Sequence, residues 1–126
     1  MTHSETLRAE LDRCASICVD RAMYVHQKWG PGLLESAYEA ALVFELRKAG
    51  LRVETEVPVP LHWEGQNLGI GYRADVVVEG ILVLELKAVA EHSDLFARQI
   101  LTYLKLLDMR LGLVINFGLK LLKGGI

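Results

Sequence analysis

Asp75, Glu85 and Lys87 interrupt the most apolar stretch of the chain, residues 74–89. Nearly every other residue in that stretch is Val, Leu, Ile, Ala or Gly, so we expect the three charges to lie in or beside the core. Buried charges are paired or bind a metal, because an unpaired buried charge is costly. The stretch therefore predicts either a structural ion pair or a site for a hard divalent cation, a phosphate and an activated water.

The 126 residues predict one domain, residues 1–126, with the composition of an ordinary globular protein: 52% hydrophobic and 24% charged. The formal net charge of −2 excludes bulk attraction to nucleic acid or to a membrane, so contact with a polyanion requires local clustering. The sequence shows neither a membrane-spanning run nor a signal peptide, which predicts a cytoplasmic protein without a membrane partner. Cys14 and Cys18 are predicted to be buried reduced thiols.

Hydrophobic periodicity predicts helices from about Leu7 to Trp29, Leu33 to Ala49 and Asp94 to Leu107. Strands are predicted over residues 51–61, 68–78, 81–89 and 111–117, the last of them buried. Pro58 and Pro60 place the first strand at a sheet edge. The order α-α-β-β-β-α-β predicts an α/β sandwich with helices packed on a mixed sheet.

The loop between the second and third predicted strands decides whether the charges meet. A two-residue turn at Glu79-Gly80 would place Asp75 opposite Leu84 and leave Glu85 on the other face of the sheet. A three-residue loop, residues 79–81, would pair Asp75 with Glu85. Glu85 and Lys87 share a face because side chains alternate along a strand. The functional interpretation therefore requires an odd-length loop or a bulge.

Three further residues bear on the same interpretation. Gln99 and Tyr103 lie four apart on one face of the third predicted helix, where they could bind phosphate or bases, or form a half-buried helix surface. Glu35 lies in the first turn of the second predicted helix. It is either favoured there by the helix dipole alone or contributes a third carboxylate to the site. Spacing does not decide between these alternatives.

The segment Gly32-x-x-Glu35-x-x-Tyr38 resembles the signature of the GxxExxY proteins, small bacterial and archaeal proteins. The resemblance spans residues 12–126, and its further matches are residues 72–75, 84–88, 99–105 and 112–118. The family is similar to the PD-(D/E)XK nuclease superfamily, with motifs like those of RecB-type nucleases.

The resemblance implies a restriction-endonuclease-like core, a four-stranded mixed sheet flanked by helices. It implies Mg²⁺ as the cofactor, with Mn²⁺ as a substitute, and Lys87 as the catalytic lysine. Many relatives carry a histidine where this chain has Phe96, and His92 lies nearby. The implied metal ligands, which are also catalytic, are Asp75, Glu85 and Glu35; the implied substrate-positioning residues are Gln99, Tyr103 and Tyr38.

The leading hypothesis is a metal-dependent phosphodiesterase that acts on DNA or RNA. The alternative is a catalytically silent module on the same fold that binds nucleic acid or another protein, which the acidic net charge and small size favour. A homodimer through the apolar first helix would widen the binding surface. A redox or transport protein is disfavoured because the sequence has no glycine-rich dinucleotide loop and no cysteine cluster.

Overall fold

The computed structural model describes residues 2–126, without the side chain of Ile70. The predicted order of elements is confirmed, with a short 3₁₀ helix added at the end. No helix in this part of the chain combines the length and the hydropathy that a membrane crossing requires. The elements are α1 (His3–Trp29), α2 (Glu35–Lys48), β1 (Val53–Trp63), β2 (Gln66–Val78), β3 (Leu82–Lys87), α3 (Asp94–Leu107), β4 (Leu111–Asn116) and η1 (Leu122–Gly125).

The four strands form one mixed sheet in the order β1-β2-β3-β4. β1–β2 and β2–β3 are antiparallel, whereas β3 and β4 are parallel and connected through α3. β1 lies at an edge, as Pro58 and Pro60 predict. β4 lies at the other edge; its last two residues, Ile115 and Asn116, are buried and the four before them are half-buried, so the prediction of a buried last strand is confirmed only for its end. An edge strand has a hydrogen-bonded neighbour on one side only.

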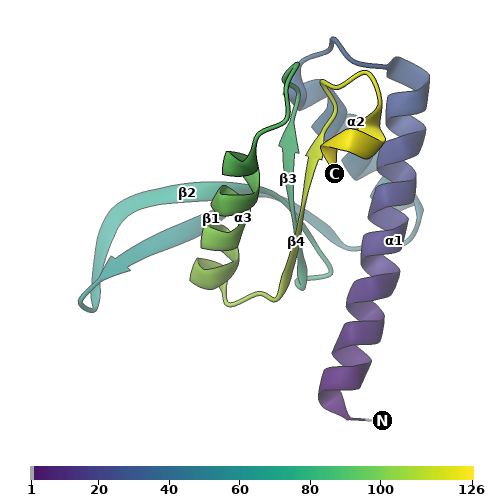
Figure 1. Cartoon of the computed structure of the whole chain (residues 1–126). Helices are drawn as coiled ribbons and strands as arrows, with labels where there is room; N and C mark the ends of the chain where they lie inside the picture. Colours follow the sequence, from purple (N-terminus) through teal and green to yellow (C-terminus); the bar gives the residue numbers. More distant parts are fainter. Residues whose placement is uncertain (1) are drawn as a thin grey trace.

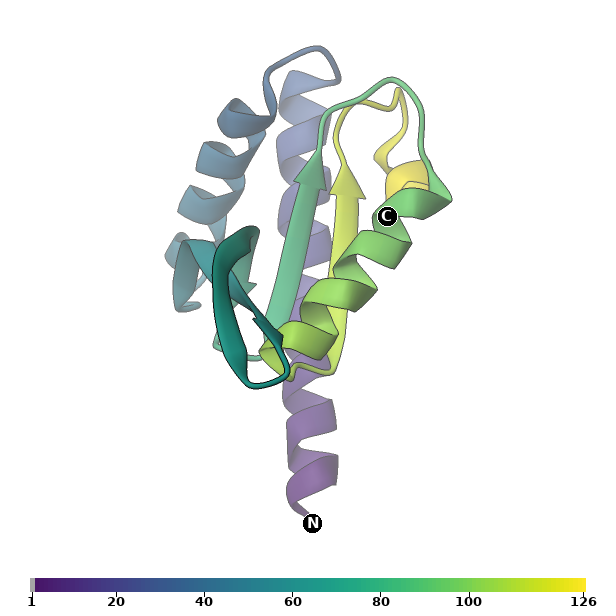
Figure 2. The same cartoon turned by 90° about the vertical axis from the view of Figure 1, so that its left-hand side faces the viewer.

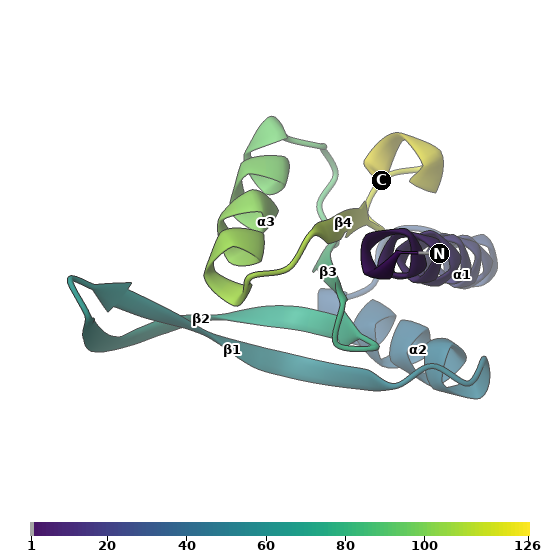
Figure 3. The same cartoon turned by 90° about the horizontal axis from the view of Figure 1, so that it is seen from below.

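Helices cover both faces of the sheet, α1 and α2 on one face and α3 on the other (Figures 1 and 3). The core on the α1/α2 face includes Cys14 and Cys18, which are free and buried as predicted. The α1 residues that pack in this core are Leu11, Cys14, Cys18, Ala22 and Val25. This apolar stripe is therefore buried within the chain, and the homodimer through the first helix stays a prediction.

The β1–β2 hairpin extends well beyond the rest of the sheet (Figures 1 and 3). β2 pairs with β3 only from Val76 to Val78, while its pairing with β1 continues to the end of the hairpin at Trp63 and Gln66. We call the projecting part, residues 57–74, the hairpin arm. Figure 2 shows α3 beside this arm, and α3 contacts β1.

The loop between β2 and β3 has three residues, as the functional interpretation required. Val78 pairs with Leu82, Val77 with Val83 and Val76 with Leu84. The amide of Ile81 donates to the carbonyl of Val78 at 3.1 Å, and Glu79 and Gly80 have φ values of 53° and 66°. Two left-handed residues thus make the tight turn, and Ile81 is the extra residue that sets the register.

Candidate active site

The ladder between β2 and β3 ends at Asp75 and Glu85, where side chains replace the backbone hydrogen bonds. The amide of Asp75 donates to Oε1 of Glu85 at 3.0 Å, and the amide of Leu86 donates to Oδ2 of Asp75 at 2.8 Å. We call Asp75, Glu85 and Leu86 the fork, because the hairpin arm separates from β3 at these residues. The register and these bonds place the two predicted acids side by side, as the three-residue loop predicts.

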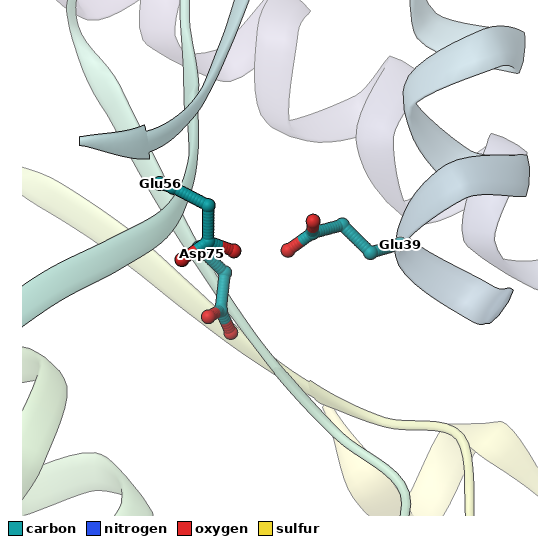
Figure 4. A group of neighbouring side chains, drawn as sticks. All are labelled: Glu39, Glu56 and Asp75. Atoms are coloured by element: carbon teal, nitrogen blue, oxygen red, sulfur yellow. The ribbon is translucent and has the colours of Figure 1, made fainter. Parts of the chain in front are cut away.

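Two further acids that the sequence did not single out, Glu39 of α2 and Glu56 of β1, lie beside Asp75 (Figure 4). One oxygen from each of the three carboxylates lies within 4.8 Å of the others. Glu56 has a φ of 51° and is missing from the β1–β2 ladder between Thr55 and Val57. The pairs on either side of it, Thr55 with Val76 and Val57 with Ala74, place Glu56 opposite Asp75, and the sequence alone did not predict this register of β1 against β2. Glu39 could have been found, because it follows Glu35 by four residues on one helix face.

Burial and mutual repulsion raise the pKa values of four carboxyl groups at this site, those of Glu85, Glu39, Glu35 and Asp75. Burial, aided by the charge of Asp75, raises the pKa of Glu85 to about 8, and the side chain is only 3% exposed. Burial and then the charge of Glu56 raise the pKa of Glu39 to about 7. The pKa values of Glu35 and Asp75 are also raised, chiefly by burial. We call these four residues and Glu56 together the acidic cluster: Glu35, Glu39, Glu56, Asp75 and Glu85.

The acidic cluster has the chemistry of a site for a hard divalent cation. Carboxylate oxygens are the ligands that Mg²⁺ and Mn²⁺ prefer. Opposed ligands of Mg²⁺ are about 4.2 Å apart, twice the ligand distance of about 2.1 Å. The 4.8 Å spread at Glu39, Glu56 and Asp75 therefore needs only small side-chain shifts to fit such an ion. Of the predicted ligands, Asp75 belongs to this closest group, and Glu35 and Glu85 border it.

Lys87 lies beside the acidic cluster but forms no ion pair with it. None of the salt bridges found among the described residues involves Asp75, Glu85 or Lys87, which argues against the structural ion pair. Instead, Nζ of Lys87 donates to Oε1 of Gln99 at 3.0 Å and lies 5.1 Å from the ring centroid of Phe96. Phe96 thus lies against the lysine on the side of α3.

Gln99 and Tyr103 continue this contact as a hydrogen-bonded chain. Nε2 of Gln99 donates to the hydroxyl of Tyr103 at 3.0 Å, so the two partners fix both ends of the Gln99 amide. The structure therefore brings Lys87, Gln99 and Tyr103 together. The helix spacing of four predicted that the last two share a face, and the fold adds their link to Lys87.

Tyr38 is the predicted site residue that the structure places elsewhere. Its side chain is fully buried and stacks on Phe117 with ring centroids 4.6 Å apart. Its hydroxyl donates to the carbonyl of Gly30 and accepts from the amide of Leu33. The prediction that Tyr38 contacts a substrate does not fit this placement, because no face of the ring is exposed. Tyr38 instead holds the loop before α2, the helix that carries Glu35 and Glu39.

Glu85→Gln is expected to stabilise the ion-free protein at pH 8. Glutamine keeps an oxygen for the amide of Asp75 but removes a buried charge. The pKa of Glu85 rises from its ordinary value of 4.5 to about 8 on folding, so the folded chain binds more protons between these pH values. The wild-type protein therefore loses stability as pH rises through this window, and the variant escapes that loss. We expect a gain of about 1–2 kcal/mol at pH 8 and almost none at pH 4.5.

Urea unfolding in EDTA at both pH values measures this effect. Glu10→Gln, at an exposed position of α1, is the matched control and should change stability equally little at both. A Glu85→Gln variant that is less stable than the wild type at pH 8 would contradict the buried-charge explanation.

A family model of the PD-(D/E)XK nuclease superfamily matches residues 12–126. The chain belongs to this superfamily. The match includes every residue of the acidic cluster, together with Lys87, Gln99 and Tyr103. Comparisons with curated proteins and with solved structures found no match.

Membership of the PD-(D/E)XK nuclease superfamily agrees with the architecture and with the site. A mixed sheet flanked by helices is consistent with a restriction-endonuclease-like fold. PD-(D/E)XK nucleases typically use divalent metals, and the acidic cluster supplies carboxylate ligands for one. The superfamily suggests a nuclease-like function and implies binding of a nucleic-acid substrate. The narrower resemblance to the GxxExxY proteins stays a prediction.

Proposed function

We propose that this protein is a metal-dependent nuclease that hydrolyses phosphodiester bonds in DNA or RNA, with Mg²⁺ as its cofactor and Mn²⁺ as a substitute. One observation carries the proposal: a group of carboxylates, of which Glu85 is buried, Glu39 and Asp75 are half-buried and Glu35 and Glu56 are exposed, lies beside a lysine that is held by a glutamine and not by an acid. A structural ion pair would join the lysine to one of these carboxylates directly. A phosphate and a cation would use both parts of this arrangement.

The five carboxylates of the acidic cluster differ in their proposed contribution to binding the ion. Asp75 is common to the predicted ligands and to the group that the structure brings closest, so we propose it as the central ligand. Glu39 and Glu56 complete that group, while Glu35 and Glu85 adjoin it. A bound hard cation polarises the phosphoryl group and lowers the pKa of a bound water.

Lys87 supplies a positive charge for the phosphate. Its ammonium has three N–H groups, of which Gln99 accepts one. The others are free to donate to a phosphate oxygen as negative charge develops there, or to orient the attacking water. Gln99 and Tyr103 are positioning residues, because their hydrogen bonds fix the direction of the Lys87 side chain before a substrate binds.

A catalytically silent binding module on the same fold is the second candidate. The formal net charge of −2 favours it, because the acidic surface gives no general attraction to a nucleic-acid backbone. The two candidates differ in turnover and not in fold. Both allow a homodimer, which stays a prediction that sedimentation tests.

Removal of the metal is the first test. We expect labelled single- and double-stranded DNA and RNA to be cleaved with Mg²⁺ or Mn²⁺ and to stay intact in EDTA, with ion binding detectable by calorimetry. Ion binding without cleavage of any of the four substrates would favour the silent module. Cleavage that persists in EDTA, or the absence of any ion binding, would reject the metal-dependent mechanism.

A further inference from the structure

A pocket of about 350 Å³ lies between the hairpin arm and α3, outside the acidic cluster. Its volume lies within the range of about 300–1,000 Å³ that is typical of small-ligand sites. Two of the five lining residues are tyrosines, so we call it the two-tyrosine pocket. The lining residues are Tyr72, Leu95, Gln99, Thr102 and Tyr103.

The two tyrosines have different surroundings. Tyr103 is 5% exposed and anchored through Gln99, whereas Tyr72 is 51% exposed. The ring centroids are 5.8 Å apart and the ring planes are tilted by 38°. The buried ring therefore supports the exposed one, which leaves part of the Tyr72 ring free to stack on a flat ligand. Stacking of a base on an aromatic side chain is a common means of binding single strands.

The two-tyrosine pocket is directly connected to the proposed catalytic lysine. Gln99 lines the pocket and accepts the hydrogen bond from Nζ of Lys87, and Tyr103 holds the other end of the same amide. The charges of Glu85 and Asp75 also reach Tyr103, where they add to burial in raising the pKa of its hydroxyl. A ligand in the pocket would thus lie next to the acidic cluster and not on a remote surface.

The pocket suits an unpaired base better than a base pair. Bases within a duplex are stacked on both faces, and their pairing edges are occupied, so none can lie on Tyr72 unless it leaves the helix. The hydroxyl of Thr102 donates to the carbonyl of Arg98, so its oxygen can still accept a hydrogen bond from the edge of a free base, and the second N–H of the Gln99 amide can donate one. Because the chain has a net charge of −2, contacts to phosphate alone would bind a strand weakly, which makes a contribution from stacking more important.

We propose that the two-tyrosine pocket binds one unpaired base of single-stranded nucleic acid, stacked on Tyr72, so that the adjoining backbone lies next to Lys87. This inference rests on the proposed function, because it assigns a substrate class to the same site. Stacking accepts both deoxyribose and ribose strands, and single-stranded DNA and RNA are therefore separate arms of the test.

Binding measurements test the inference without requiring turnover. Fluorescence anisotropy gives the Kd of labelled single-stranded DNA and RNA, of the same sequences in blunt duplexes, and of an abasic strand with the same phosphates. Each is measured in EDTA and again with Ca²⁺, which takes similar oxygen ligands. The variants are Tyr72→Ala and Tyr72→Trp. Tyr24→Ala is the matched control, since Tyr24 is a 40% exposed tyrosine on the opposite face of the sheet.

We expect the wild type to bind at least one kind of single strand more tightly than its duplex. Tyr72→Ala should weaken that binding by about 5- to 150-fold, the range for loss of one base stack. Tyr72→Trp should restore it, and Tyr24→Ala should leave it unchanged. The abasic strand should bind weakly and equally to the wild type and Tyr72→Ala, because it has no base to stack.

Three results would overturn the inference: no binding of either single strand, duplex binding at least as tight, or an effect of Tyr72→Ala that is equal for normal and abasic strands. These outcomes are separable from the proposed function. Tyr72-dependent binding without metal-dependent cleavage would support the pocket and reject the nuclease. Cleavage that is indifferent to Tyr72→Ala, with unchanged single-strand binding, would support the nuclease and reject the pocket.

Discussion

Asp75→Asn is expected to lower the rate of Mg²⁺-dependent cleavage about a thousandfold and to weaken ion binding. Asp75 is the one residue that belongs both to the ligands predicted from the sequence and to the closest group of carboxylates in the structure. The substitution removes its charge but keeps an oxygen that accepts from the amide of Leu86. A thousandfold loss corresponds to about 4 kcal/mol, which is reasonable where a metal stabilises several kcal/mol of developing charge. Initial cleavage rates and calorimetric titration with Mg²⁺ measure the two effects.

Asp12→Asn is the control for this experiment, because Asp12 is an exposed aspartate on α1. It should leave both the cleavage rate and the ion affinity unchanged. Urea unfolding of all three proteins checks that Asp75→Asn still folds. If Asp75→Asn cleaves as fast as the wild type, the acidic cluster is not the catalytic site.

Lys87→Met is expected to separate catalysis from ion binding. Methionine keeps most of the length and the apolar stem of the side chain, but loses the ammonium that would donate to the phosphate. We expect cleavage to fall by about 100- to 1,000-fold, the effect of losing one well-placed donor in a transition state. The affinity for Mg²⁺ should stay the same or rise slightly, since a positive charge beside the carboxylates has been removed.

Lys105→Met, at an exposed position of α3, is the matched control and should change neither quantity. Parallel losses of cleavage and of ion affinity in Lys87→Met would point to a structural role for the lysine. Full activity would remove it from the proposed mechanism.

Local sequence signals predicted most of the fold. Helical periodicity and proline and glycine positions gave the order of the elements, and the predicted bounds of α3 match the structure. The sequence left a two-residue and a three-residue β2–β3 loop open, and the structure has the three-residue loop that the functional interpretation required. The edge position of β4 could not be predicted from the sequence, because an apolar strand has the same residue pattern in the middle of a sheet as at its edge.

The site was predicted less completely than the fold, for reasons that concern tertiary placement. Glu56 lies opposite Asp75 in the register of β1 against β2, which no local sequence signal predicted. Tyr38 follows Glu35 by three residues and so lies on the same side of α2, yet Tyr38 is fully buried while Glu35 is exposed, because the spacing does not report how deeply each position of the helix is packed. Lys87 and Gln99 were each predicted, but only the packing of α3 against the sheet shows that they touch.

In the fork, Asp75 and Glu85 also hold β2 against β3 through their hydrogen bonds. The strand that carries the hairpin arm, β2, is attached to β3 by three residue pairs and by the two hydrogen bonds that Glu85 and Asp75 accept. The oxygens that anchor the arm therefore belong to the residues proposed to hold the ion. Thermodynamic linkage is reciprocal: if a strand on Tyr72 steadies the arm and so tightens ion binding, the ion must tighten strand binding by the same factor. Occupancy of the two sites would then be cooperative without any moving domain.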